Sequence, residues 1–319
     1  MSLALVFPGQ GSQAVGMGKA LAENFAAARA VFAEVDSALG QNLSGLMFEG
    51  PESDLTLTAN AQPALMAVSI AVLRVLEAEA GFDLAREAKF VAGHSLGEYS
   101  ALAAAGAFSL SDTARLLRIR GDAMQKAVPV GQGAMAALLG MEYEAGVEVT
   151  AEAQAAVPGS VCQIANDNGG GQVVASGSRA AVEKAMEIAK AKGVKRAILL
   201  PVSAPFHCAL MQPAADVMAE ALAGVVVHAP KVPVVANVLA TAITDPVDIR
   251  RRLVEQVTGT VRWRECMTYM GQQGVDSFYE LGAGKVLSGL VKRIVATASG
   301  ASIGTPADVE SFKSRPKAG

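Results

Sequence analysis

Residues 93–97 read Gly93-His94-Ser95-Leu96-Gly97, and this pentapeptide is the most informative stretch of the chain. A Gly-x-Ser-x-Gly sequence at a sharp turn between a strand and a helix holds the serine hydroxyl out for nucleophilic attack. The flanking sequence fits that context, because residues 89–92 are typical of the end of a buried strand and the alanine-rich residues 98–108 favour a helix. The order of strand, turn and helix predicts an enzyme with Ser95 as its nucleophile.

Outward from the pentapeptide, short apolar strands alternate with helical patterns. This alternation predicts an α/β fold with a parallel sheet flanked by helices on both faces. We expect no regular structure after about residue 305. Strands are predicted at 3–7, 232–237 and 277–280, and helices at 14–21, 25–39, 61–80, 112–127 and 246–258.

The middle of the chain has a different order of predicted strands and helices. Its elements follow the order β-α-β-β-α-β, which is that of a ferredoxin-like subdomain. We therefore expect a large domain made of residues 1–128 and 202–319, and an inserted subdomain at 129–201. The strands are predicted at 134–141, 161–165, 172–176 and 195–200, and the helices at 142–155 and 179–192.

Composition and charge exclude several classes of protein. With 319 residues and 51% hydrophobic content, the chain can bury a sizeable core. A net charge of −3 and scattered basic residues argue against nucleic-acid binding, which needs a concentrated basic surface. The longest apolar stretch, 64–73, is too short to span a bilayer and predicts a buried helix.

The cysteines and the first residues indicate the compartment. Cys162, Cys208 and Cys266 are odd in number and far apart, which fits reduced thiols better than a disulfide framework. Residues 1–7 have no basic segment and only a short apolar run, unlike a secretory signal. We expect a soluble cytoplasmic protein without a membrane anchor.

A serine hydroxyl needs a neighbouring base, and histidine is the usual one. The chain has three histidines. His94 adjoins Ser95 on the turn and cannot normally fold back onto its hydroxyl. His207 stands in the irregular segment 203–207, as expected of a loop facing a cleft, whereas His228 resembles the end of a buried strand. Position favours His207 and leaves His228 as an alternative.

Four motifs in a fixed order make a resemblance specific. They are similar to those of the malonyl-CoA:acyl carrier protein transacylase family of fatty acid synthesis, and the similarity covers nearly the whole chain. The resemblance implies a hydrolase-like α/β domain with an inserted ferredoxin-like domain, in agreement with the order of elements above. The motifs are Phe7-Pro8-Gly9-Gln10-Gly11-Ser12-Gln13, Gly93-His94-Ser95-Leu96-Gly97-Glu98-Tyr99, Phe206-His207 and Glu280-Leu281-Gly282-Ala283-Gly284-Lys285-Val286-Leu287.

The resemblance implies a ping-pong reaction in which Ser95 becomes malonylated and His207 acts as base and then as acid. Malonyl-CoA is then a substrate, acyl carrier protein the partner, no metal or redox cofactor is needed, and we expect a monomer. Gln256 matches an amide position of the family that helps to orient the histidine and contributes to substrate binding. The alternative for Gln256 is a buried glutamine that satisfies backbone groups.

Two backbone donors and one arginine complete the predicted site. The N–H of Leu96, directly after the nucleophile, is the natural first oxyanion donor, and the resemblance implies the N–H of Gln10 as the second. Arg120 matches the arginine that binds the malonyl carboxylate in this family. A planar guanidinium suits a planar carboxylate, because it can donate two hydrogen bonds to it. The alternative is a solvated helix arginine, which is what we expect of Arg115 and Arg118.

Two glycine-rich stretches have other interpretations. Gly9, Gly11 and Ala14 fit a dinucleotide-binding fingerprint, but residues 25–38 have helical spacing where that fold needs a second strand. The stretch 282–285 lacks the remaining residues of a phosphate-binding loop and predicts a turn into a helix. We expect neither to bind a nucleotide cofactor.

Acyl carrier proteins are acidic, so their docking surface should be locally basic. A serine esterase or thioesterase that releases the acyl group to water is the first alternative function, and an inactive module that only binds the carrier is the second. Phe206 beside His207 resembles malonyl-selective relatives, and Cys208 is expected to be a packed thiol. The candidate basic clusters are Lys195 with Arg196, Arg250 to Arg252, and Lys292 with Arg293.

Overall fold

The computed structural model describes residues 2–202 and 204–315, and within them the larger sheet has six strands. Neighbouring strands are parallel except for the last pair, which is antiparallel. The predicted α/β class is confirmed. In spatial order the strands are β10 (Ser299–Ile303), β9 (Ser277–Leu281), β1 (Leu3–Phe7), β2 (Ala88–Gly93), β7 (Val234–Val235) and β8 (Ala242–Ile243).

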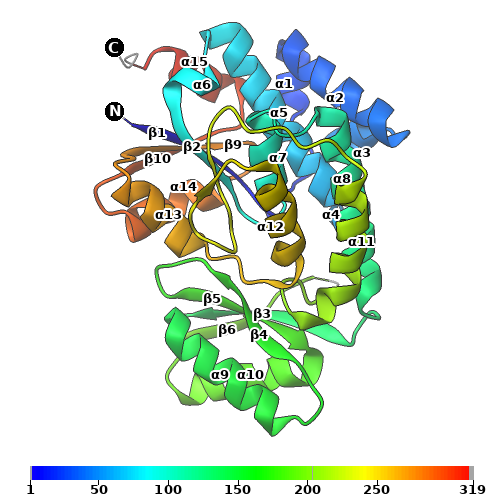
Figure 1. The fold of residues 1–319 in the computed structure, drawn as a ribbon, viewed down its shortest axis with the longest axis vertical. Helices are drawn as coiled ribbons and strands as arrows, with labels where there is room; N and C mark the ends of the chain where they lie inside the picture. The colour runs from blue at the N-terminus through cyan, green and yellow to red at the C-terminus, as the bar shows by residue number, and fades with distance from the viewer. Residues whose placement is uncertain (1, 203, 316–319) are drawn as a thin grey trace.

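Alternate residues of β1 enter two different cores, as the period of a strand requires. Leu5 and Phe7 pack into the larger core, while Ala4 and Val6 pack into the smaller one on the other face. Figure 1 shows helices on both sides of this sheet. They are α1 (Lys19–Asn24), α2 (Ala26–Leu39), α3 (Leu43–Glu49), α4 (Glu52–Thr56), α5 (Thr58–Ala80), α6 (Leu84–Glu87), α7 (Gly97–Ala104), α8 (Leu110–Ala127), α11 (Gln212–Ala223), α12 (Pro246–Thr258), α13 (Trp263–Gln272), α14 (Val286–Ile294) and α15 (Pro306–Lys313).

Helix α5 is the central helix of the larger core. It has 23 residues and is buried along most of its length. Among the described residues it alone is long and apolar enough to cross a membrane, but 89% of its apolar window is buried inside the protein. The buried helix predicted at 64–73 is thereby confirmed.

A second sheet of four antiparallel strands has a hydrophobic core of its own. Its strands follow the spatial order β4-β5-β3-β6, and the chain order agrees with the predicted β-α-β-β-α-β pattern. Figure 1 shows this sheet and its two helices at the lower end of the molecule. The elements are β3 (Gly133–Leu139), α9 (Tyr143–Ala156), β4 (Cys162–Asp167), β5 (Gln172–Ser178), α10 (Arg179–Ala191) and β6 (Arg196–Leu199).

Three sequence-based expectations about local structure are wrong. The first helix begins at Lys19 rather than near residue 14, because the glycine-rich segment before it forms turns. His228 lies in an exposed loop and not at the end of a strand. The segment after residue 305 forms α15, whose first turn is closed by a capping box between Thr305 and Asp308.

Candidate active site

Ser95 stands on the sharp turn between β2 and α7, as the pentapeptide predicts. Its backbone is left-handed, with φ at 54°, a conformation that is unusual outside glycine. The two glycines of the motif are required by close approach: a Cβ at Gly93 would lie 1.8 Å from the Gly97 carbonyl oxygen, and one at Gly97 would lie 2.2 Å from the Phe7 oxygen. The turn therefore fits only with glycine at both positions.

His207 lies next to Ser95, with its Nε2 2.7 Å from the serine Oγ. The Nδ1 of His207 lies 2.9 Å from the carbonyl oxygen of Gln256 and 3.2 Å from that of Gly259. Carbonyl oxygens only accept, so the hydrogen-bond network assigns the proton to Nδ1 and leaves Nε2 as the acceptor for the serine hydroxyl. Ser203, at the start of the segment predicted to carry this histidine, lies outside the described residues.

The surroundings of His207 keep its ring neutral. Burial is the main cause that lowers the pKa of His207 to about 3, and the positive charge of Arg120 adds to it, while the two carbonyl contacts oppose it. His207 also has a left-handed backbone, with φ at 58°. A neutral imidazole is the form that can take a proton from Ser95.

Arg120 reaches Ser95 from α8. Only 1% of the residue is exposed, and its Nη2 donates to Ser95 Oγ at 3.2 Å and to Gln256 Oε1 at 3.0 Å. Its Nη1 donates to Gln62 Oε1 at 2.7 Å. All three acceptors are neutral, and Arg120 forms no ion pair with any described residue. Burial lowers the pKa of this guanidinium, and the nearby Tyr99 and Glu98 oppose the shift.

Gln256 lies beneath the nucleophile. Its side chain is buried, and Nε2 donates to the Ser95 carbonyl oxygen at 3.0 Å and to Glu98 Oε2 at 2.9 Å. Its backbone carbonyl, rather than its amide, accepts the hydrogen bond from His207. The side-chain amide therefore bonds to the Ser95 carbonyl and to Arg120, and Gln256 does not line the cavity beside Ser95.

Two residues that sequence reasoning did not single out support this arrangement. Asn237 accepts a hydrogen bond from the Ser95 N–H at 2.8 Å and donates to the Gly93 carbonyl at 2.7 Å. Glu98 accepts from the Asn237 N–H at 2.9 Å. Burial raises the pKa of Glu98 to about 7, and its contacts with Asn237, Gln256 and the charge of Arg120 oppose that rise. Glu98 follows the pentapeptide directly, but nothing in the sequence connects it to Asn237.

The two predicted oxyanion donors lie at one cavity. Both Gln10 and Leu96 line it. Among the described residues, the N–H groups of Gln10 and Leu96 donate to no protein acceptor. The side chain of Gln10 is held from behind, since the Thr58 hydroxyl donates to its Oε1 at 2.9 Å. Two backbone donors beside a serine nucleophile are what a tetrahedral intermediate needs.

This cavity has a volume of about 470 Å³ and lies between the two sheets. Phe206, which is largely buried, forms part of its wall beside His207. Cys208 faces away, with its thiol 3.1 Å from the Pro205 carbonyl, in agreement with a packed thiol. The large-sheet side contributes Gln10, Gln62, His94, Ser95, Leu96, Arg120 and Met124, and the small-sheet side Met135, Asn166 and Leu200.

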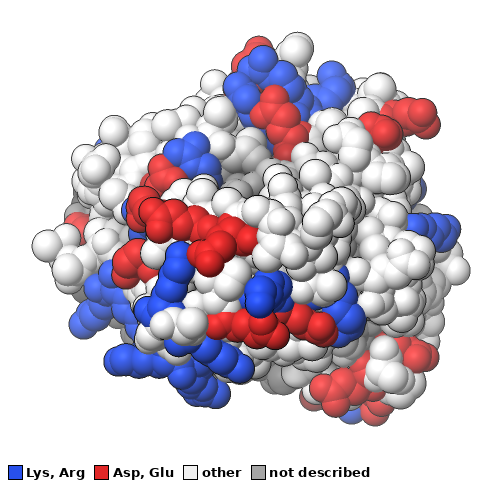
Figure 2. All heavy atoms as spheres, turned by 90° about the horizontal axis from the view of Figure 1, so that it is seen from below, with Lys and Arg blue, Asp and Glu red and all other residues white. Residues whose placement is uncertain are grey.

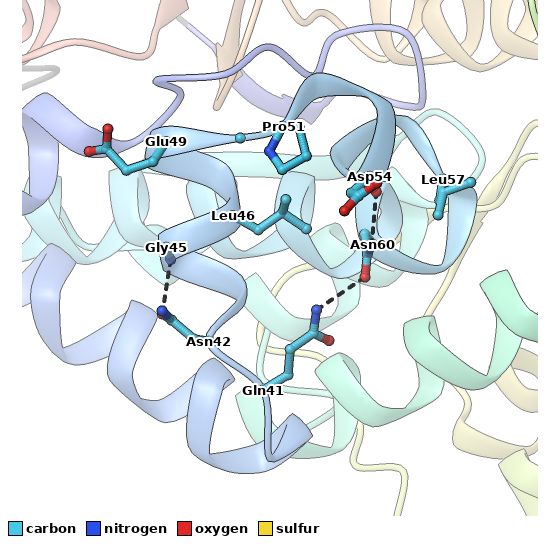
Figure 3. Close-up of a pocket in the computed structure, with 10 residues that line it drawn as sticks. Gln41, Asn42, Gly45, Leu46, Glu49, Pro51, Asp54, Leu57 and Asn60 are labelled. Carbon is cyan, nitrogen blue, oxygen red and sulfur yellow. Dashed lines mark hydrogen bonds between the residues drawn. The ribbon is translucent and has the colours of Figure 1, made fainter.

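A second hollow lies on the other side of α4, between α3 and the start of α5 (Figure 3). It has a volume of about 710 Å³, and Leu57 lies on its rim. The neighbouring Arg118 donates to Asn60 Oδ1 at 2.8 Å and is half-buried, unlike the exposed Arg115. The residues that line this hollow include no serine, cysteine or histidine, so it offers no pair like Ser95 and His207.

Comparisons with known proteins agree with this geometry. The acyl transferase domain family matches residues 4–305. The malonyl CoA-acyl carrier protein transacylase of Bacillus subtilis (strain 168) is 47% identical over 308 residues, which are 97% of this chain and 95% of that protein. The protein of the same name from Escherichia coli (strain K12) is 45% identical over 303 residues, covering 95% of this chain and 96% of that protein.

Solved structures extend the similarity to the whole fold. The crystal structure of acyl-carrier-protein-S-malonyltransferase from Bartonella henselae has a TM-score of 0.94 and 57% identity, covering 98% of each chain. A malonyl-transacylase solved in complex with a type II PKS acyl-carrier protein has a TM-score of 0.93 and 42% identity, again covering 98% of each chain. The chain therefore belongs to the acyl transferase domain family, among the malonyl CoA-acyl carrier protein transacylases.

Proposed function

We propose that this enzyme transfers the malonyl group of malonyl-CoA to the phosphopantetheine thiol of acyl carrier protein through a malonyl ester of Ser95. The observation that carries the proposal is the guanidinium of Arg120, which is buried without an ion pair among the described residues and lies 3.2 Å from the nucleophile. A buried positive charge facing the reacting atom favours a substrate with a second carboxylate.

In the first half-reaction, Ser95 Oγ attacks the thioester carbonyl while its proton moves to His207 Nε2. The carbonyl electrons move onto oxygen, and the N–H groups of Gln10 and Leu96 stabilise the resulting oxyanion. Collapse of the tetrahedral intermediate breaks the carbon–sulfur bond, and the leaving CoA sulfur takes the proton from His207.

The second half-reaction repeats these steps with another thiol. His207 takes the proton of the phosphopantetheine thiol, whose sulfur attacks the malonyl ester, and Ser95 Oγ leaves with that proton. The same cavity serves both steps, because both thiols must reach the same ester carbon. These steps need no metal or redox cofactor, as each is a proton or acyl transfer.

The charge distribution supports one docking surface for the acidic carrier protein. Figure 2 shows acidic side chains among the basic ones on the small-sheet end of the molecule. The carrier protein would therefore bind to a local cluster of basic residues and not to this whole end. Arg251 and Arg252 are paired with Asp248, and the Arg250 guanidinium is hydrogen-bonded to backbone carbonyls. The guanidinium groups of that cluster are already bonded within the protein and are less available to an acidic partner.

The other two clusters are close to each other. A side chain at Gly170 would meet Arg293 Cδ at 3.2 Å, and one at Gly140 would meet Lys195 Cγ at 3.7 Å. Gly171, in the same turn as Gly170, packs against Gly140, because a Cβ added at Gly171 would lie 3.5 Å from the Cα of Gly140. The proposed docking strip consists of Lys195, Arg196, Lys292 and Arg293, none of which forms an ion pair with a described residue.

Three further assignments belong to this proposal. Residues 129–201 form the inserted subdomain, since β3 to β6 with α9 and α10 pack around a core of their own. The enzyme works as a monomer in the cytoplasm. The buried, unpaired Cys162, Cys208 and Cys266 support the reducing compartment.

Intact-mass measurement tests the proposed function. Wild-type protein mixed with malonyl-CoA is expected to gain one malonyl group, and Ser95→Ala is expected to gain none. Addition of acyl carrier protein should remove the adduct and yield malonyl-carrier protein. Release of free malonate at the rate of turnover would instead identify a thioesterase, and tight carrier binding without any adduct would identify an inactive binding module.

A further inference from the structure

Three successive hydrogen bonds connect the buried arginine to the loop that carries Gln10. Arg120 Nη1 donates to Gln62 Oε1 at 2.7 Å. Gln62 Nε2 donates to the hydroxyl of Thr58 at 2.9 Å. That hydroxyl in turn donates to Gln10 Oε1 at 2.9 Å. The connection runs from α8 through α5 to the loop after β1.

The guanidinium fixes the directions of the first two bonds in this series. A guanidinium can only donate, so the Gln62 carbonyl must face Arg120 and its NH₂ group must face Thr58. A hydroxyl that accepts from Gln62 still has one proton to give, and Gln10 Oε1 is its acceptor. A flip of the Gln62 amide would place its NH₂ group against the guanidinium of Arg120, with two donors face to face.

The series is shielded from solvent. Arg120, Gln62 and Thr58 are each 1% exposed. The helices come close at Gly121, the residue after Arg120, where a Cβ would lie 2.7 Å from the Thr58 carbonyl oxygen. Buried polar groups that lose a partner are costly, so each bond strongly restricts its neighbours.

The loop that receives the last bond has few other attachments. Between Gly9 and Val15, in the part of the chain that the structure describes, no backbone N–H donates to a backbone carbonyl. The Gly11 N–H is bonded only to the side chain of Gln13 within the same loop, at 2.7 Å. The Thr58 hydroxyl therefore makes the hydrogen bond that ties the Gln10 side chain to a helix of the core, while Gly9 of the same loop packs against the backbone of His94.

We infer that Thr58 is a positioning residue for the reaction: its hydroxyl holds the Gln10 loop so that the Gln10 N–H meets the oxyanion, and links that loop to Arg120. The inference rests on the proposed function. It also implies that the carboxylate-binding and oxyanion-binding groups form one hydrogen-bonded unit. Thr58 acts through Gln10 and touches no substrate.

The test compares three threonine variants in steady-state malonyl transfer at saturating acyl carrier protein, with kcat and KM measured for malonyl-CoA. Thr58→Val keeps the shape and removes the hydroxyl, and we expect about a tenfold fall in kcat with KM changed less than about twofold, because the oxyanion exists only in the transition state. Thr58→Ser should restore kcat to within about twofold of wild type. Thr113→Val is the matched control, since that buried hydroxyl only bonds to the Ser109 carbonyl of its own helix.

The variant Gln10→Leu covers the case in which Thr58→Val does not fold, and the double variant is informative where Thr58→Val folds. Gln10→Leu removes the Oε1 acceptor and keeps the backbone N–H, so it should lower kcat about as much. Combined with Thr58→Val, it should add no further loss, because both changes break the same bond. Additive losses would overturn the inference, as would a wild-type kcat in either variant, a loss confined to KM, or a Thr58→Ser variant as slow as Thr58→Val.

The proposed function and this inference fail in different ways. A wild-type protein that forms no malonyl adduct contradicts the proposed function. A wild-type protein that forms the adduct, together with a Thr58→Val variant that forms it equally fast, contradicts the inference alone.

Discussion

The Oγ of Ser95 and the Nε2 of His207 lie 2.7 Å apart, although 112 positions separate the two residues in the chain. The serine comes from the turn after β2, and the histidine from the irregular segment that follows the small sheet. Both backbone carbonyls behind the histidine belong to the end of α12 and the residue after it. The pair is therefore assembled from three parts of the large domain that meet at the cavity.

The first prediction concerns the pH dependence of acylation. The pKa of His207 is lowered to about 3, so this histidine stays neutral as the pH falls from 7.5 to 5.5. We expect the single-turnover acylation rate to change less than about twofold over that range, whereas an ordinary histidine would lose about tenfold. The rate is measured by rapid quenching and intact mass, with His228→Ala as the control for an exposed histidine. A fall centred near pH 6.5 in both proteins would contradict the prediction.

The second prediction concerns acyl selectivity. Arg120→Ala should lower kcat/KM for malonyl-CoA by about 100-fold or more, since a carboxylate loses charge-assisted hydrogen bonds. Acetyl-CoA has no such carboxylate, so its transfer relative to malonyl transfer should rise. Arg115→Ala, in the same helix but exposed, serves as the control. If the ratio of the two activities is the same in wild type and Arg120→Ala, Arg120 does not bind the carboxylate.

The third prediction concerns stability and pH. The pKa of Glu98 is raised to about 7 in the folded state from its ordinary value of 4.5, so between these pH values the folded protein holds a proton that the unfolded chain releases. Glu98 therefore costs stability as the pH rises from about 4.5 to 7. Relative to wild type, Glu98→Gln should gain more than about 1 kcal/mol of unfolding free energy between pH 4.5 and pH 8. Urea unfolding of both proteins at the two pH values measures the difference, and a constant difference would refute the prediction.

The fourth prediction uses two glycines. Gly97→Ala would place a Cβ 2.2 Å from the Phe7 oxygen, so it should destabilise the protein by about 2 kcal/mol or more and abolish acylation. Gly289→Ala adds the same atom to α14 with nothing within 4 Å, and should stabilise the protein by about 0.5–1 kcal/mol. Thermal unfolding distinguishes them, and equal effects of the two changes would count against the packing described at the turn.

The fifth prediction concerns the carrier protein. Reversing the charge of Lys292 and Arg293 together should raise KM for acyl carrier protein about tenfold, more at low salt, and leave acylation by malonyl-CoA unchanged. Arg251→Glu, in the cluster already paired with Asp248, is the control and should have little effect. A larger effect from Arg251 would move the docking surface to α12.

The sequence carried enough information for the fold class and for the turn that holds Ser95, because both depend on local signals. Short apolar runs predicted β1 and β2, and the glycines around Ser95 predicted the turn. His207, Arg120 and the second oxyanion donor came from the resemblance, since no local pattern connects residues so far apart. Alone, the residues left His228 open.

The polar residues that support the site could not be predicted, because no local sequence pattern marks them. Asn237 bonds to Ser95 across 142 positions, and Thr58 bonds to Gln10 across 48. Single polar residues in apolar segments are ordinary in a sequence, and only burial and distance reveal that these ones are connected. Helix α15 was missed for a different reason, as its capping box precedes a short segment with little hydrophobic periodicity.

The left-handed backbone at Ser95 and His207 has a consequence for how this enzyme can change. Among the described non-glycine residues, only these two and Ala240 have positive φ. Such a conformation disfavours most side chains by about 1–3 kcal/mol and is tolerated best by glycine and asparagine. Replacing either residue by glycine should therefore relieve backbone strain and abolish activity. Selection for thermal resistance alone does not protect these two strained residues, so searches for more stable variants need an activity screen at every round.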